Sequence, residues 1–503
     1  MARLRLLWSV VFAVPALGHT PAARAQIHTA PPAAVLPLSS GPANLPVSLP
    51  AATAAATDRP MPINLATALS LASARPLDVA VAQERVKAAV AQLDRANVYW
   101  LPTVLVGGDY FRHDGRIQDN AGAVSDVSKS AMMLGAGPSA VFAVSDAIFA
   151  PLAARQVVAA RQAEAQAASN DSLLAVAEAY FNVQQARGEL AAAADAARRA
   201  ADLASRTTQQ PIVDLAPAFE ASRARTESYR RQQFVHAARE RWRSASADLN
   251  RLLRLDPAAL VEPTEPAHLQ VTLIDLGHPV DELIPIALSS RPELAAQQAL
   301  VQAALERLRQ ERLRPLVPSV LLRGASTNPT GTLGAGVFGG GPNGFVGNSG
   351  ARMDLDIQLV WEFQNLGFGN KARVDEQRAE HNRAVLESFR TQDRVAAEVA
   401  QTYAQAQSAT ERLKLAELGL KEAVETADKS LAGLGQTKRS GNLILLVVRP
   451  QEAVAALQAL AQAYADYFGA LGDSNRAQFR LYRALGQPAQ LVLGAGECAV
   501  PQQ

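Results

Sequence analysis

Apolar and polar side chains alternate from residue 353 to residue 363, which reads M-D-L-D-I-Q-L-V-W-E-F. Successive side chains of a β-strand point to opposite faces, so the alternation predicts a strand with one apolar and one largely polar face. The apolar face comprises Met353, Leu355, Ile357, Leu359, Trp361 and Phe363, and the polar side chains of the other face are Asp354, Asp356, Gln358 and Glu362.

A half-buried strand of a soluble protein would show the same alternation. The length favours a membrane strand, because a tilted strand needs about 9–11 residues to cross the hydrocarbon layer. The apolar face would then meet lipid and the polar face a water-filled lumen. Trp361 and Phe363 would lie near the end of the span, where aromatic girdles form.

The chain also repeats itself. Arg75-Pro76 and Leu101-Pro102 return 216 residues later as Arg291-Pro292 and Val317-Pro318. A nearly constant offset indicates an internal duplication. We therefore expect a first structural repeat over 63–257, a linker over 258–279 and a second repeat over 280–488, followed by a tail over 489–503.

Each repeat reads helix, strand, loop, strand, long helix, turn, helix. In the first repeat we expect a helix at 76–99, strands at 103–112 and 139–149, a long helix at 153–210 and a return helix at 218–254. The second repeat has a long helix at 370–433 and a return helix at 450–485. Globular helices average about 11–12 residues, so the long helices are not ordinary core helices. Their packing surface is mostly alanine, which buries too little for an isolated hairpin, so neighbouring rods are needed.

Two strands per repeat make four per chain, which is too few to close a barrel in lipid. Two chains would supply eight strands, whose interior is filled by side chains, whereas three would supply twelve and leave a channel. The inward carboxylates favour a wet lumen, and hence a homotrimer.

The N-terminus has the pattern of an export signal: Arg3 and Arg5, an apolar run over 6–17 and an A-x-A site at 23–25. We expect a signal peptide at 1–25 and a Pro/Ala-rich linker with little order at 26–62. Cleavage would change the formal charge from +2 to −1, which argues against nucleic acid as a partner. The apolar run at 131–154 contains Gly and Pro and does not favour a spanning helix. An exported chain without one is periplasmic, secreted or an outer-membrane barrel.

Three patterns suggest chemistry but have simpler explanations. The G-x-G-x-x-G at 334–339 lies in a Gly-rich stretch that we interpret as a loop at the outer mouth of a barrel, not a nucleotide site. The histidines are scattered, so no metal site or other cofactor is expected. The acids of the 353–363 strand could form a catalytic pair, but a lumen lining explains their spacing, and we expect no enzyme activity.

The chain resembles the TolC family of outer-membrane efflux ducts. The resemblance rests on the duplicated Arg-Pro and Leu/Val-Pro junctions, the passage from Trp361 to Gly369 and the paired Tyr180 and Tyr403. It implies a mainly α fold with membrane β-strands: a trimer with a 12-strand β-barrel, four strands per chain, that continues into a long periplasmic α-helical barrel. It also implies docking to a periplasmic adaptor protein and an inner-membrane transporter of the RND or ABC class.

The second tip departs from the family pattern of a glycine followed six residues later by an acid. Gly441-Asn442 is followed by an apolar run that ends with Val447 at that position, and the flanking residues Lys438, Arg439 and Arg449 are basic. Either the match to the family pattern is shifted by a few residues, or the duct closes by apolar packing instead of an acidic ring. Asp214 near the first tip is a candidate to replace the missing acid. The run 443–448 is expected to pack in a core at the start of the return helix or to contact an adaptor.

The predicted function is a passive outer-membrane exit duct of a tripartite efflux or type I secretion system. The alternative is a periplasmic coiled-coil scaffold or adaptor with a small soluble β-domain, which needs no closed barrel.

Overall fold

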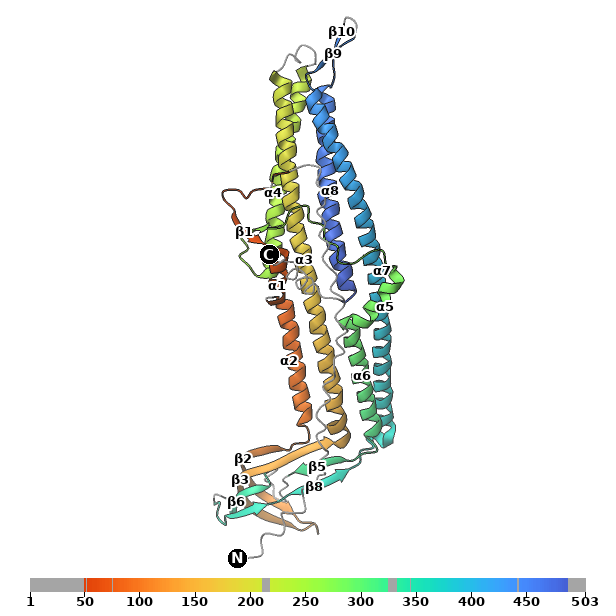
Figure 1. Ribbon diagram of the computed structural model, residues 1–503. Coiled ribbons are helices and arrows are strands. Elements are labelled where there is room, and N and C mark those ends of the chain that lie inside the picture. The colour runs from red at the N-terminus through yellow and green to blue at the C-terminus, as the bar shows by residue number, and fades with distance from the viewer. Residues whose placement is uncertain are drawn as a thin grey trace, which may run out of the picture.

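The computed structural model describes residues 49–50, 52–74, 76–209, 218–323, 333–343, 345–440 and 443–486. Two helices of 66 residues each, α3 (Val144–Gln209) and α7 (Phe368–Gly433), run from a β-sheet at one end to a tip at the other, with shorter helices between them (Figure 1). At about 1.5 Å per residue each helix is roughly 100 Å long. The other helices are α1 (Leu65–Ala74), α2 (Leu77–Asn97), α4 (Ala218–Leu253), α5 (Val280–Ser290), α6 (Pro292–Leu313) and α8 (Pro450–Ala484).

The shorter helices lie end to end along the long ones. α2 and α4 pack on α3, while α6 and α8 pack on α7 (Figure 1). α3 also packs against α6 and α8, which joins the two sets into one rod. The order of helices and strands thus repeats, as expected from the recurring Arg-Pro junctions.

Several element boundaries differ from those predicted. β3 spans Val124–Ala143, and α3 begins at Val144, so the strand expected at 139–149 is wrong for its second half. β2 (Thr103–Gln118) is longer than expected, because its pairing with β3 along its whole length stabilises a polar segment of poor strand propensity. Pro151 lies inside α3, just past its second turn, whereas the predicted helix began after it, at residue 153.

The expected linker at 26–62 is partly ordered. Its last residues belong to β1 (Arg59–Ile63), which pairs in parallel with β4 (Ala259–Pro263) from the linker between the repeats. The expectation of little order before residue 63 is therefore wrong for β1. The predicted signal peptide and the tail at 489–503 lie outside the described residues.

One helical stretch in the described part of the chain, Leu65–Asn97, could cross a membrane by its length and composition alone. The sequence pattern did not single it out. It comprises α1 and α2, and Ala68 and Leu69 of α1 are fully buried in a core beside α3.

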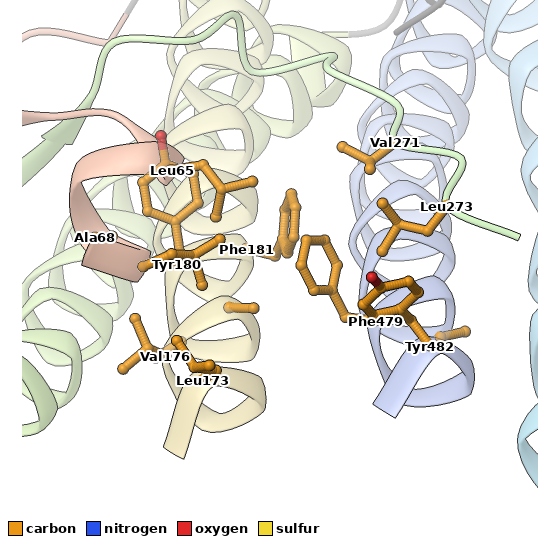
Figure 2. Close-up of a cluster of buried hydrophobic side chains, with 14 of the residues drawn as sticks. Leu65, Ala68, Leu173, Val176, Tyr180, Phe181, Val271, Leu273, Phe479 and Tyr482 are labelled. Carbon is orange, nitrogen blue, oxygen red and sulfur yellow. The ribbon is translucent and has the colours of Figure 1, made fainter. Parts of the chain in front are cut away.

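A buried core joins the repeats halfway along the rod. Tyr180 and Phe181 of α3 lie opposite Phe479 and Tyr482 of α8 (Figure 2), and the ring centroids of Phe181 and Phe479 are 5.4 Å apart. Tyr180 of α3 and Tyr403 of α7 have matching roles, because each hydroxyl donates a hydrogen bond to the linker between the repeats. Tyr180 bonds the Glu265 carboxylate, and Tyr403 bonds the Leu276 carbonyl at 3.0 Å. Burial, with the Glu265 contact second, raises the pKa of Tyr180 and keeps its hydroxyl protonated.

Amides of α8 hold the linker against this core. Gln478 Oε1 accepts the backbone N–H groups of Leu273 and Ile274 at 3.1 and 3.0 Å. Asn475 Oδ1 accepts the N–H of Val271 at 2.9 Å. These side chains satisfy backbone groups that would otherwise be buried without a partner.

Gln478→Leu is expected to lower the free energy of unfolding by about 2 kcal/mol, because it leaves two buried N–H groups unpaired. Chemical denaturation in detergent, followed by circular dichroism, measures the change. The matched control is Gln462→Leu, an exposed glutamine on the same helix, which should stay within about 0.5 kcal/mol of the native chain. Equal effects would contradict the linker role.

Gly188 permits the close approach of α3 and α8. A Cβ at this position would lie 2.5 Å from the ring of the buried Phe468, whereas a Cβ at Gly419 of α7 would meet nothing within 4 Å. Gly188→Ala should therefore destabilise the fold by about 1–2 kcal/mol through overpacking. Gly419→Ala should stabilise it by up to about 1 kcal/mol through helix propensity. Melting temperatures of the two variants should move in opposite directions, and a shared direction would refute the packing argument.

Candidate membrane sheet and tip

Six strand segments form one antiparallel sheet at the end of the rod. They occupy four strand positions. β2 and β3 each fill one position. The third position is shared by β5 (Ser319–Arg323) and β6 (Ala335–Gly341), which both pair with β3. The fourth is shared by β7 (Gly350–Met353), which pairs with β6, and β8 (Asp356–Val360), which pairs with β5.

The strand predicted at 353–363 is thus interrupted. β7 ends at Met353, β8 begins at Asp356, and residues 361–363 lie beyond the strand. A continuous eleven-residue strand is wrong, although its two faces are preserved. Met353, Leu355, Ile357, Leu359, Trp361 and Phe363 are all more than half exposed.

Pairing register places Met353, Ile357 and Leu359 on one apolar face. Ile357 and Leu359 pair with Leu322 and Val320, which pair with Ala140 and Phe142 of β3. The same side of β3 carries apolar residues or proline at every second position over eleven residues: Met132, Leu134, Ala136, Pro138, Ala140 and Phe142. It continues on β2 with Val104, Val106 and Tyr110. Toward the N-terminal end of β3 the apolar series stops, and the same face carries the polar residues Ser130, Ser128 and Asp126. The apolar band has the height that a tilted strand needs to cross hydrocarbon.

The opposite face of the sheet carries both apolar and polar side chains and is more polar than the apolar face. By register it carries Asp356 and Gln358 of β8, Arg352 of β7 and Lys129 of β3. Gln358 Nε2 donates to Asp356 at 2.9 Å, and Arg352 Nε contacts Asp354 at 2.6 Å. Asp354 lies in the gap between β7 and β8, and Glu362 accepts a bond from Gln364 at 2.8 Å. Each of the three acids thus contacts a different neighbouring side chain.

The G-x-G-x-x-G motif lies largely in β6, so its assignment to a loop is wrong. Gly336 pairs with Gly135 of β3. A Cβ on Gly336 would lie 2.2 Å from the Leu134 carbonyl oxygen, so the glycines allow two backbones to approach. A phosphate-binding turn before a helix is absent from this described segment, and no group of His, Cys, Asp and Glu among the described residues could hold a metal.

The passage from β8 to α7 contains a strained turn, η2 (Gln364–Gly367). Asn365 and Leu366 have φ of 47° and 60°, in the left-handed region, where a residue with a Cβ costs roughly 1–2 kcal/mol. Gly367 follows with φ of 92°. The buried Asn370 clamps the turn by accepting the N–H of Gln364 at 2.8 Å. This strain was not detectable from the hydrophobic pattern.

At the tip the structure replaces the expected helix start with a hairpin. β9 (Thr437–Ser440) pairs with β10 (Leu443–Leu446), so assigning residues 443–446 to the start of the return helix is wrong. Lys438 and Arg439 lie on β9. Arg449 precedes α8, and its N–H donates to Glu452 at 3.1 Å. Asp214, Gly441 and Asn442 lie outside the described residues.

A four-position sheet with one apolar face, joined to a helical rod about 100 Å long, defines the class of the protein: an outer-membrane channel protein with a periplasmic helical domain. Sequence comparison gives a family match for the second repeat. Residues 283–487 match the family model described as outer membrane efflux protein. The TolC-like resemblance, the outer-membrane location and the mainly α fold with a β-sheet at one end are confirmed, while the trimer and its closed 12-strand barrel stay predictions. No curated protein matches the chain.

Solved structures share the fold. The chain is similar to the outer-membrane channel OprN, with 17% identity, 85% of this chain and 90% of that chain covered, and a TM-score of 0.67. It is also similar to VceC from Vibrio cholerae, with 15% identity, coverage of 84% and 96%, and a TM-score of 0.66. CusC gives 18% identity, coverage of 88% and 97%, and a TM-score of 0.67.

Proposed function

We propose that three copies of the chain close one barrel in the outer membrane and act as a passive exit duct. The observation that carries the proposal is the pair of unpaired sheet edges. In the described part of the chain, β2 pairs only with β3, while β7 and β8 pair only with β6 and β5. Unpaired backbone groups in lipid cost several kcal/mol each, so the edges need partners. Three chains supply twelve strand positions, enough to surround an aqueous bore.

The rod supports the same assembly. α7 leaves Leu386, Phe389, Leu415 and Leu418 more than half exposed along its length. These side chains would be buried against the α2 and α4 helices of the next copy. The polar residues Asp354, Asp356, Gln358 and Glu362 would line the bore, whose selectivity then depends on width and charge and requires no catalytic group.

The tip is the proposed contact with the rest of an export system. It lies at the end of the rod opposite the sheet (Figure 1), where a complex anchored in the inner membrane would meet it. Lys438, Arg439 and Arg449 give the second tip a basic character that suits an acidic adaptor surface. An inner-membrane transporter of the RND or ABC class would supply the energy.

The oligomeric barrel is tested by cross-linking its edges. In a Cys498→Ser background, Val104→Cys on β2 and Leu359→Cys on β8 are combined, and outer membranes are treated with a short thiol cross-linker. The double variant should give a ladder that ends at three chains, and each single variant should not. The complex should be heat-modifiable and require detergent.

A ladder that ends at two chains would refute the trimer. Recovery of the chain from the soluble periplasm, without cross-links, would refute the duct and favour the scaffold or adaptor.

A further inference from the structure

We propose that the strained turn at Asn365–Gly367 is a lipid anchor that places Leu366 in the inner leaflet of the outer membrane. This inference rests on the proposed duct, because it assumes that the apolar sheet face meets lipid. It concerns a segment beyond the barrel strands, at the start of α7.

The backbone of this turn points to an external partner. Leu366 is held in the left-handed conformation, which disfavours leucine, yet its side chain is 92% exposed. Phe368 is 76% exposed. The turn is held by the polar side chain of Asn370, and the apolar side chains contribute little to packing within the chain. A strained, exposed leucine stabilises the protein only if its surroundings are apolar.

The neighbouring junctions extend the same surface. The α2–β2 junction exposes Trp100, the start of α3 exposes Ile148, and the α6–β5 junction exposes Leu316. The four connections between sheet and rod lie together at one end of the rod (Figure 1), and each therefore carries a large exposed apolar side chain. This continuity favours one apolar environment for the sheet and the turn.

Charge identifies the occupant as an anionic phospholipid leaflet. The exposed Lys371 and Arg373 follow Phe368 within about 8 Å along α7. Along α7, apolar side chains thus come first and cations next. This order matches a lipid leaflet, in which acyl chains are followed by phosphate headgroups. A protein partner would need no such order along the membrane normal.

A spin label tests the location of Leu366. The full chain carries Cys498→Ser and Leu366→Cys, and is reconstituted in vesicles of phosphatidylethanolamine and phosphatidylglycerol. Collision rates with oxygen and with a water-soluble nickel chelate are compared. We expect the ratio of oxygen to nickel accessibility at Leu366 to exceed several-fold that of Lys421→Cys. Lys421 is an exposed polar residue on the same helix, about 83 Å away, and is not among the apolar residues proposed to contact the next copy.

A label at Leu134→Cys, on the apolar sheet face, separates this inference from the duct proposal. If Leu134 is in lipid and Leu366 is in water, the anchor is refuted and the duct stands. If both are in water, the duct proposal fails and the anchor fails with it. If Leu366 is shielded from both reagents, the turn contacts another copy of the chain and the anchor is refuted.

Discussion

Arg291→Met is expected to lower the free energy of unfolding by about 3 kcal/mol, because it removes a buried cation from a network of charges. The Arg291 side chain is 3% exposed and contacts Glu398 at 2.5 Å and Glu293 at 2.9 Å. Arg483 contacts the same two carboxylates, at 3.1 and 2.7 Å. The network joins α6, α7 and α8 at the Arg-Pro junction of the second repeat.

The magnitude follows from burial. Breaking a buried pair by removing one partner costs about 3–5 kcal/mol. The lower end applies because the Glu398 side chain is 36% exposed and Arg483 remains beside both acids. Denaturation in detergent, followed by circular dichroism, gives the value. Arg378→Met, which removes the exposed pair with Asp375, is the control and should cost less than about 1 kcal/mol. A similar cost for both variants would show that the network contributes no more than a surface pair.

Ile357→Lys is expected to lower membrane assembly by a depth-dependent cost of about 2–4 kcal/mol, because it places a lysine on the lipid face of a barrel. Ile357 is 63% exposed on the apolar face of β8. Ile357→Leu keeps that face apolar and should be tolerated. The fraction of chain in heat-resistant oligomers of the outer membrane measures the effect.

The adjacent position supplies the matched control. Gln358 lies on the opposite face of the same strand, so Gln358→Lys should assemble nearly as well as the native chain. If the Ile357→Lys variant assembled normally, or if Ile357→Lys and Gln358→Lys reduced assembly equally, the apolar face would not be the face that meets lipid.

Local patterns in the sequence were sufficient for the main architecture. The alternation at 353–363 identified the two faces, because side-chain direction in a strand depends only on position along the chain. Runs of helix-forming residues identified α3 and α7, and the repeated Arg-Pro junctions predicted that the order of helices and strands recurs. The acids and the apolar residues of the sheet were therefore assigned to separate faces before their neighbours were known.

Tertiary contacts decided the rest. β1 pairs with β4 across about 200 residues of sequence, and β2 extends through polar residues because β3 lies beside it. The interruption between β7 and β8, the left-handed Leu366 and the hairpin at the tip depend on partners and backbone angles that hydrophobic periodicity does not encode. Arg291 appeared in the sequence as a helix boundary, and only packing revealed it as a buried charge, because burial depends on which helices meet around a side chain.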